Sequence, residues 1–529
     1  MGIERWKPRL GMTRQEVTLL RSLRRTRKLF AFLRDYRREL FDDEFQAELE
    51  TMYRTTGAGK DPVPPALLAM ASLLQGYLGV SDAEAVELTI VDLRWQMVLD
   101  CLGAETAAFS QGALQAFRER LIRADMDRRL LERTIELARR TKAFDWKKLP
   151  KDLRLAVDSA PLDGAGKVED TINLLGHAAR KIVDCAAALV EKTSARVAKE
   201  AGIPALLAPS VKKGLDQDWG TRDARDAALR TLLDQLANLE RWLATHLATE
   251  LTTPPLKELV DTLHKLLDQD LEPDPSRGGK RIREGVAPDR RISISDSEMR
   301  HGHKSKSKRI DGYKRHIATD LDTNLVLACV VTPANQPEKD ALALMQPDIA
   351  RHKRGISQAH FDRAYVASPL VAGMEDAGVE IVCKPWPQQG EGFSKADFKF
   401  DLRARTVTCP AGQTEPFLPG ATVSFDAATC TSCELRPACT ASTTGRGRKL
   451  RILENEPLQE RLRRAIATRA GRARLRQRVA IEHSLAHVTR RQGRRARYRG
   501  ARSNLYDTRR ASALTNLEIV QRRLEASAA

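Results

Sequence analysis

Apolar residues recur at helical spacing through the first part of the chain. The period runs from "ALLAMASLLQGYLGV" to "FSQGALQAFRERLIR", with Ser81 and Ser110 at positions typical of helix N-caps. Glycine and proline in "GAGKDPVPP", residues 57–65, interrupt it. The pattern predicts a helical N-terminal domain over residues 1–150.

After residue 150 the period changes from helical to alternating. "LRLAVDS" (153–159) predicts a strand that ends on Asp158. "SQAHFDRAYV" predicts a second short strand, which ends on Asp362. Two acids are therefore expected at the ends of strands.

Further strands and a late helical stretch complete the predicted core. "KRHIATD" (314–320) and "NLVLACVVT" (324–332), joined by "LDT", are typical of a hairpin. "VEIVCKP" (379–385) predicts another strand, and helical spacing returns over 456–492. The fold class expected is a mixed α/β core built from three stretches of the chain, 151–170, 291–385 and 456–529.

Two segments interrupt this core. Residues 171–290 return to helical spacing, with one stripe of leucines over 229–243 and a second apolar stripe over 256–267. The simplest interpretation is an antiparallel helical hairpin packed on itself. Residues 386–455 hold four of the eight cysteines, so a cysteine-rich insertion is expected there.

Length and composition narrow the class of protein. A chain of 529 residues is too long for one compact core, and 42% hydrophobic with 30% charged residues favours a folded chain over a disordered one. No apolar run approaches the roughly 18 residues of a membrane-spanning helix. The first thirty residues lack the apolar region of a secretory signal. We therefore expect a cytosolic protein that contacts the chromosome if it binds DNA.

The net charge of +19 points to a polyanionic partner. A generally arginine-rich proteome is the alternative explanation. The positive charge is clustered, however, in residues 290–315 and 461–510; the second stretch holds seventeen arginines and two acids. The clustering favours nucleic acid binding.

Three carboxylates are candidates for a metal site. Asp158 and Asp362 end strands that can be neighbours in a sheet, and Glu482 lies on a late helix that can pack across it. Converging carboxylates suit Mg²⁺ or Mn²⁺, and two such ions about 3.5–4 Å apart support in-line displacement at a phosphodiester. Each acid also has a simpler interpretation: the aspartates as turn or helix caps, and Glu482 as the partner of Arg478 four residues earlier.

The segments around these acids resemble the DDE transposases of bacterial insertion sequences, within the IS1182 family of the IS4-like group. The resemblance rests on "AVDSAPLDGAGKVEDTINLLGHAARKIV" around Asp158, "HFDRAYV" around Asp362, and "RVAIEHSLAHVTRRQGRRARYRG" around Glu482. "ISISDSEMRHGHKSKSKRIDGYKRHIATD" and "PVPPALLAMASLLQGYLGVSDAEAVELTIVDLRW" resemble other parts of the same proteins. The segments occur in the family's order along nearly the whole chain.

The resemblance implies an RNase H-like catalytic core in which Asp158, Asp362 and Glu482 hold two Mg²⁺ or Mn²⁺ ions. It also implies a reaction on the insertion sequence, whose ends are marked by terminal inverted repeats. The enzyme would hydrolyse DNA at these ends, and the freed 3′ hydroxyls would attack target DNA. Such a site needs no Ser or Tyr nucleophile. Such a protein must hold both ends of the insertion sequence at once, so a homodimer or larger assembly on double-stranded DNA is expected. Residues 1–150 are expected to bind DNA or to form the dimer.

Two positions depart from the related IS4 pattern. Leu475 stands where that pattern has tyrosine, and Thr489 where it has lysine; Arg490 or Arg491 is the candidate to replace the lysine's charge. A DNA-binding protein derived from a transposase, and a metal-dependent nuclease of the same fold, therefore stay open as alternatives.

DNA contacts are expected from the two basic stretches and their flanks. His301 and His303 also suggest a metal pair, but the lysines around them favour phosphate contacts. The residues expected to touch DNA are Arg300, His303, Lys304, Lys306, Lys314, Arg478, Arg490, Arg491, Arg494, Arg497 and Tyr498.

The cysteine-rich insertion predicts a zinc knuckle. Cys430 and Cys433 are spaced to grip one face of a tetrahedral Zn²⁺, and Cys409 and Cys439 can close the other. Free thiols and disulfides are the alternatives, the latter disfavoured in a reducing cytosol. The remaining cysteines lie in apolar segments and are expected in the core: Cys101, Cys185, Cys329 and Cys383.

Overall fold

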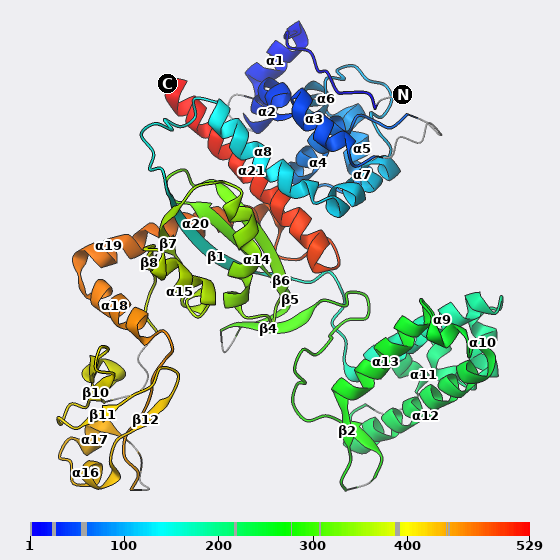
Figure 1. Ribbon diagram of the computed structural model, residues 1–529. Coiled ribbons are helices and arrows are strands. Elements are labelled where there is room, and N and C mark those ends of the chain that lie inside the picture. The colour runs from blue at the N-terminus through cyan, green and yellow to red at the C-terminus, as the bar shows by residue number, and fades with distance from the viewer. Residues whose placement is uncertain are drawn as a thin grey trace.

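The computed structural model describes residues 3–23, 28–53, 61–215, 219–276, 278–305, 308–386, 392–440, 442 and 445–528. Helices occupy the N-terminal part, as predicted (Figure 1). Ser81 and Ser110 are confirmed as N-caps, because their side chains accept hydrogen bonds from the backbone N–H of Glu84 and Ala113. These helices are α1 (Arg14–Ser22), α2 (Lys28–Leu40), α3 (Asp43–Glu50), α4 (Pro65–Leu78), α5 (Asp82–Val91), α6 (Leu93–Leu99), α7 (Gln111–Arg123) and α8 (Met126–Arg140).

A mixed sheet forms the centre of the molecule (Figure 1). Its strands are β1 (Leu153–Asp163), β4 (Arg300–Ser305), β5 (Lys308–Asp320), β6 (Val326–Pro333), β7 (Ile356–His360) and β8 (Glu380–Val382). β1 pairs antiparallel with β5 and parallel with β7, which pairs parallel with β8. β5 and β6 form the predicted antiparallel hairpin. The order β6–β5–β1–β7–β8 is consistent with the RNase H-like core that the resemblance implies.

Helices from the later part of the chain surround the sheet. The predicted helical stretch over 456–492 is divided into three helices, with breaks at Thr468 and Arg478, which cap the helices that follow. The helices of this part are α14 (Glu338–Ala350), α15 (Pro369–Asp376), α18 (Glu456–Ala467), α19 (Arg469–Gln477), α20 (Val479–Gln492) and α21 (Ala501–Ala528); a 3-10 turn, η3 (Arg363–Tyr365), follows β7.

The C-terminal helix α21 joins the N-terminal helices to the sheet (Figure 1). Leu514, Leu517 and Val520 belong to one hydrophobic core that extends from α2 to the sheet. Arg509, 6% exposed, pairs with Asp125 and with two further acids, Asp127 and Asp348. Arg509 and Arg510 are thus buried in the fold, although both belong to the basic stretch 461–510 of the sequence.

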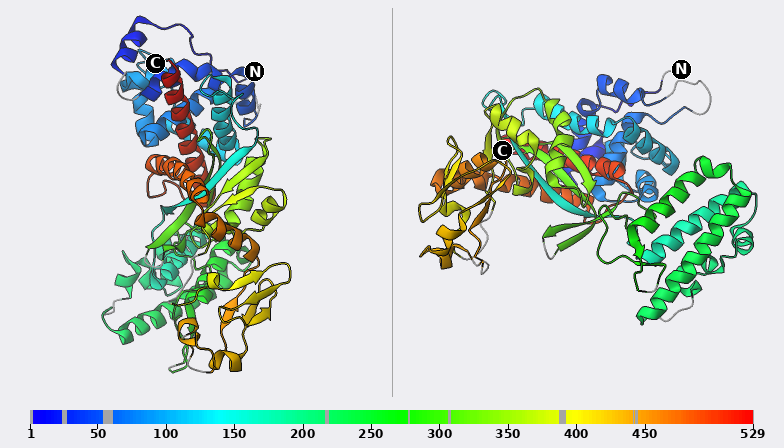
Figure 2. Two further views of the ribbon diagram at one scale, coloured as in Figure 1. Left: turned by 90° about the vertical axis from the view of Figure 1, so that its left-hand side faces the viewer. Right: turned by 60° about the horizontal axis from the view of Figure 1, so that its bottom comes forward.

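Two smaller units lie away from the N-terminal helices (Figures 1 and 2). The first has its own hydrophobic core, built from both predicted leucine stripes. The two stripe helices each contact a third helix, α9, which the predicted two-helix hairpin lacked. Its elements are α9 (Thr171–Leu189), α10 (Ser194–Glu200), η1 (Pro204–Leu207), α11 (Val211–Gly214), α12 (Arg222–His246), η2 (Glu250–Thr252), α13 (Leu256–Asp270), β2 (Leu271–Pro273) and β3 (Lys280–Ile282).

The second unit contains the clustered cysteines. Short strands and helices surround a small core that includes Phe398, Val407 and Ile452. Its elements are η4 (Lys395–Asp397), β9 (Lys399–Asp401), β10 (Thr406–Thr408), β11 (Thr414–Pro416), β12 (Thr422–Ser424), α16 (Ala427–Thr431), α17 (Arg436–Cys439) and β13 (Lys449–Arg451). Within the described ranges no single helix is long and apolar enough to cross a membrane, and only α4 and α5 together, bent by 103°, pass that test.

Candidate active site

The sheet brings Asp158 and Asp362 to the same place. β1 and β7 are parallel neighbours, and Ala156 pairs with His360. Asp158 lies two residues further along β1, which continues to Asp163 and does not end at Asp158 as predicted. Asp362 lies two residues beyond His360, where β7 ends. Asp362 also caps the turn η3, accepting a hydrogen bond from the backbone N–H of Arg363 at 2.8 Å. Asp362 is therefore a cap, as its simpler interpretation from the sequence proposed, and it also lies close to Asp158.

Arg478 lies between the two aspartates. Its Nη2 donates to Asp158 Oδ2 at 3.0 Å, and its Nη1 to Asp362 Oδ1 at 3.4 Å. Arg478 is the N-cap of α20, and Glu482 lies in the first turn of that helix. Burial lowers the pKa of Arg478, but the negative charges of Asp158, Asp362 and Glu482 outweigh this and raise it. Two aspartates, from β1 and from the turn after β7, therefore contact one guanidinium group, and the charge of Glu482 on α20 also acts on it.

These side chains do not form a ready metal cage as they lie. Among the residues that the structure describes, no group of three or more His, Cys, Asp or Glu side chains is arranged to hold a metal ion. The aspartate oxygens face the guanidinium group of Arg478, and Glu482 is exposed to solvent. Arg478, expected to touch DNA or to pair with Glu482, instead pairs with both aspartates.

A buried chain of polar side chains holds the turn that carries Asp362. Tyr365 Oη lies 2.6 Å from His316 Nδ1, and His316 Nε2 lies 3.0 Å from Thr332 Oγ1. Tyr365 and His316 are both 0% exposed. Burial, then the charge of Lys314, lowers the pKa of His316 to about 3, so the imidazole is neutral. The sequence analysis missed His316; the signal available was a polar residue in a strand otherwise predicted to be buried.

A buried arginine fixes the other end of α20. Arg315, 0% exposed, donates to Gln492 Oε1, to the backbone oxygen of Gly493 and to that of Pro161, each at 2.9 Å. Burial lowers its pKa to about 10. The helix that carries Glu482 is therefore tied to both β1 and β5. The sequence analysis missed this residue as well, because nothing in a local pattern shows which backbone oxygens an arginine will reach.

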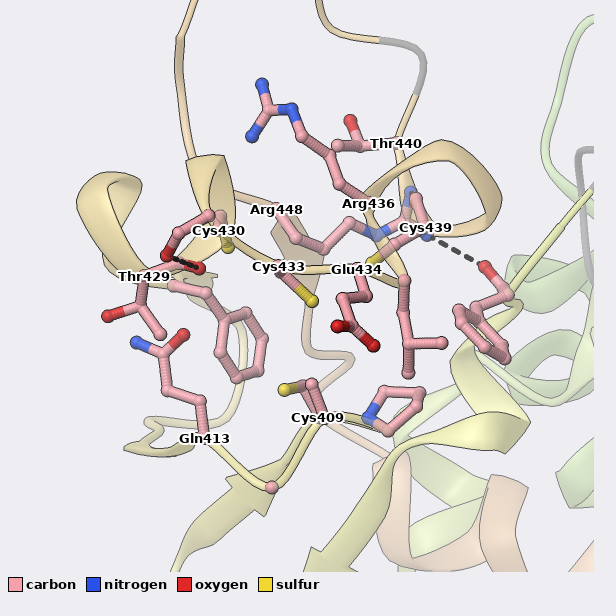
Figure 3. A pocket seen from close by; sticks show the side chains of 17 residues that line it. Cys409, Gln413, Thr429, Cys430, Cys433, Glu434, Arg436, Cys439, Thr440 and Arg448 are labelled. Carbon is pink, nitrogen blue, oxygen red and sulfur yellow. Dashed lines mark hydrogen bonds between the residues drawn. The ribbon is translucent and has the colours of Figure 1, made fainter.

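The four clustered cysteines line one cavity of about 760 Å³ (Figure 3). All four are free and partly buried. Burial raises the pKa of the Cys439 thiol, and the nearby Cys430, Cys409 and Cys433 raise it further, against the opposing effect of Arg448. The four residues of the zinc prediction thus line the same cavity, but within the described ranges no three of them are arranged to hold a metal ion as they lie. Of the cysteines expected in the core, Cys329 and Cys383 are buried, and Cys101 and Cys185 are half-buried.

Comparison with known families places two transposase models on the chain. Residues 408–520 match a model described as "Transposase DDE domain", and residues 23–120 match one described as "Transposase domain (DUF772)". The chain carries the domains of a DDE transposase. It is therefore a member of a catalytic class of protein. No curated protein and no solved structure matches the chain.

The DDE match covers only part of the candidate site. It contains Glu482 and the four clustered cysteines, whereas Asp158 and Asp362 precede it. The matched segment is therefore connected to the two aspartates by contacts in the folded structure and not by the sequence match. Arg478, inside the match, reaches both aspartates outside it.

Some of the residues expected to touch DNA are held in contacts within the fold, and others are exposed to solvent. Arg300, 9% exposed, pairs with Asp289, and Arg491 pairs with Glu518, so both stabilise the fold as they lie. Three other side chains are also engaged: Lys314 donates to a backbone oxygen, Tyr498 packs under Arg118, and Arg478 binds the aspartates. Lys306 lies outside the described residues. The exposed group is His303, Lys304, Arg490, Arg494 and Arg497.

Proposed function

We propose that this transposase binds the terminal inverted repeats of an insertion sequence of the IS1182 type, hydrolyses DNA at the ends of the element and joins the 3′ hydroxyls to target DNA. The observation that supports this most is the convergence of Asp158 and Asp362 on Arg478, at the start of the helix that carries Glu482. The two matched transposase domains agree with it.

The chemistry of the donor set fits a divalent cation. Support comes from the guanidinium group of Arg478, which donates to one carboxylate oxygen of Asp158 and one of Asp362 and so lies where both can contact a cation. Asp158, Asp362 and Glu482 would hold Mg²⁺ or Mn²⁺, since hard cations prefer carboxylate oxygens. Bound there, such ions supply activation of the attacking oxygen and stabilisation of the leaving oxygen of a phosphodiester.

Other residues of the chain position the site and the DNA. Tyr365 and His316 hold the turn of Asp362, and Arg315 holds the helix of Glu482. The exposed group of basic residues lies partly between Asp158 and Asp362 in the sequence and partly after Glu482, and it would bind phosphates of the duplex. Arg490 is the exposed cation next to Thr489, since Arg491 pairs with Glu518.

The test is incubation of the full chain with Mg²⁺ and DNA that carries the inverted repeats flanking its gene. Joined products are expected, and they should be lost in Asp362→Asn. The matched control is Asp376→Asn, which makes the same change at an exposed residue of α15. Joining that survives Asp362→Asn would show that the site assignment is wrong. Two alternatives have their own outcomes: cuts without joining indicate a nuclease, and binding alone indicates a DNA-binding derivative.

Two copies of the chain are proposed to hold the two ends of the element together. A single active site reacts at one strand end at a time, so pairing two ends requires at least a dimer on DNA. Measuring the mass of the complex with inverted-repeat duplex by light scattering tests this. A complex with one chain and one duplex at saturating concentrations would contradict it.

We further propose that Cys409, Cys430, Cys433 and Cys439 bind one structural Zn²⁺. The support is their common cavity and the chemistry of the side chains, since four cysteine sulfurs are a donor set that Zn²⁺ prefers (Figure 3). Elemental analysis of the purified chain is expected to find about one zinc ion, lost in Cys433→Ser and retained in the control Cys101→Ser. Zinc content unchanged in Cys433→Ser would refute the assignment.

A further inference from the structure

Arg478 is placed unusually for a residue of a DNA-cutting site. Its side chain is 16% exposed, and its guanidinium group is shared between Asp158, 13% exposed, and Asp362, 48% exposed. Its Nε is buried without a hydrogen-bond partner in the described structure. Burying an arginine in this way is costly unless the two carboxylates compensate its charge. The arrangement therefore makes Arg478 the counter-ion of both aspartates.

A divalent ion and this guanidinium group compete as cations for the same two carboxylates. Arg478 donates to Oδ2 of Asp158 and Oδ1 of Asp362, atoms of the two carboxylates that the proposed function gives to the metal. An ion bound by the aspartates would lie next to a like charge in a partly buried place, where repulsion is screened weakly. The ion and Arg478 at this position therefore weaken each other's binding, and movement of Arg478 out of the site would relieve the repulsion.

The neighbouring structure offers Arg478 a second position. It is both the last capping residue of α19 and the first of α20, at a break between two helices. The adjoining α19 carries exposed arginines, among them Arg469 and Arg476. A guanidinium group that swings out of the aspartates would join this positive surface, which is suited to DNA phosphates.

We propose that Arg478 is an exchangeable counter-ion: it holds Asp158 and Asp362 in the metal-free protein, and metal binding releases it to a DNA phosphate. Metal and DNA then strengthen each other's binding, because each favours the released position of the same side chain. This inference rests on the proposed function, since it takes Asp158 and Asp362 as the metal ligands.

The experiment measures the affinity of the full chain for Mn²⁺ by electron paramagnetic resonance, without DNA and with an inverted-repeat duplex that already ends at the 3′ hydroxyl. The variant is Arg478→Gln, and the matched control is Arg222→Gln, the same change at an exposed arginine of α12. Arg478→Lys keeps the charge but removes the fork that spans two carboxylates.

Without DNA, Arg478→Gln is expected to bind Mn²⁺ about tenfold more tightly than the natural chain, and Arg222→Gln to match the natural chain. DNA should strengthen Mn²⁺ binding by the natural chain and have little such effect in Arg478→Gln. Arg478→Lys should lie between them. Mn²⁺ affinity in Arg478→Gln equal to or weaker than that of the natural chain would overturn the inference while leaving the metal site intact. Absence of Mn²⁺ binding in every form, with or without DNA, would overturn the proposed metal site and the inference with it.

Discussion

The hydrogen bond between Tyr365 and His316 allows a sharp test of how the site is held. Tyr365→Phe removes only the hydroxyl group, so it leaves the aromatic ring and its packing in place. The lost contact is 2.6 Å long, and both side chains are 0% exposed. His316 Nδ1 would then be buried without a partner and out of reach of water, which costs about 1–3 kcal/mol. The free energy of unfolding is expected to fall by that amount.

Urea denaturation followed by circular dichroism at neutral pH measures this change. The matched control is Tyr53→Phe, since Tyr53 Oη is buried and has no hydrogen-bond partner within the described residues. That variant should be neutral or slightly more stable, because it removes a hydroxyl group that makes no bond. If both variants lost the same stability, or if Tyr365→Phe lost less than about 0.5 kcal/mol, the reasoning about a buried polar chain would be wrong. DNA cleavage should also fall in Tyr365→Phe, because η3 carries both Tyr365 and the cap Asp362.

Three further predictions concern stability. Arg509→Ala leaves three acids without their shared partner and should cost about 3–5 kcal/mol in urea unfolding, whereas the exposed control Arg222→Ala should change little. Burial lowers the pKa of His316 from 6.5 to about 3, so between these values the unfolded chain binds a proton that the folded chain does not. The contribution of His316 to stability is thus complete above about pH 6.5 and is lost as the pH falls towards 3. His316→Asn should therefore flatten a plot of unfolding free energy against pH between these two values. An unchanged slope in this variant would contradict the assignment. Gly302→Ala places a Cβ 2.1 Å from a backbone oxygen just after β6, so it should lower the melting temperature and weaken DNA binding, while Gly112→Ala, in open space, should do neither.

Much of the sheet and its two aspartates followed from local pattern. Alternating apolar residues predicted the strand that carries Asp158 and the one that leads to Asp362, and the hairpin of β5 and β6 was predicted by two apolar runs around a short turn. Ser81 and Ser110 were recognisable as caps because a cap satisfies backbone groups only three residues away. Signals of this kind act over a few residues, and the sequence contains them completely.

Partners far apart in the chain could not be predicted in this way. Arg478 was expected to meet Glu482 or DNA, yet it pairs with an acid 320 residues earlier and another 116 residues earlier. Arg300 and Arg491 lie in basic stretches but pair with acids inside the fold. The sequence shows how many cationic side chains a stretch contains, but it does not show which acids lie beside them in the folded protein.

By itself, then, the sequence determined the elements, the three candidate acids and the basic character that points to DNA. The tertiary structure alone decided which arginines face solvent, which are counter-ions of buried acids, and that two aspartates share one guanidinium group. The physical reason is the distance along the chain over which each kind of interaction acts. Helix and strand patterns and caps depend on neighbours a few positions apart, whereas ion pairing depends on which surfaces the folded chain brings together and how far each is shielded from water.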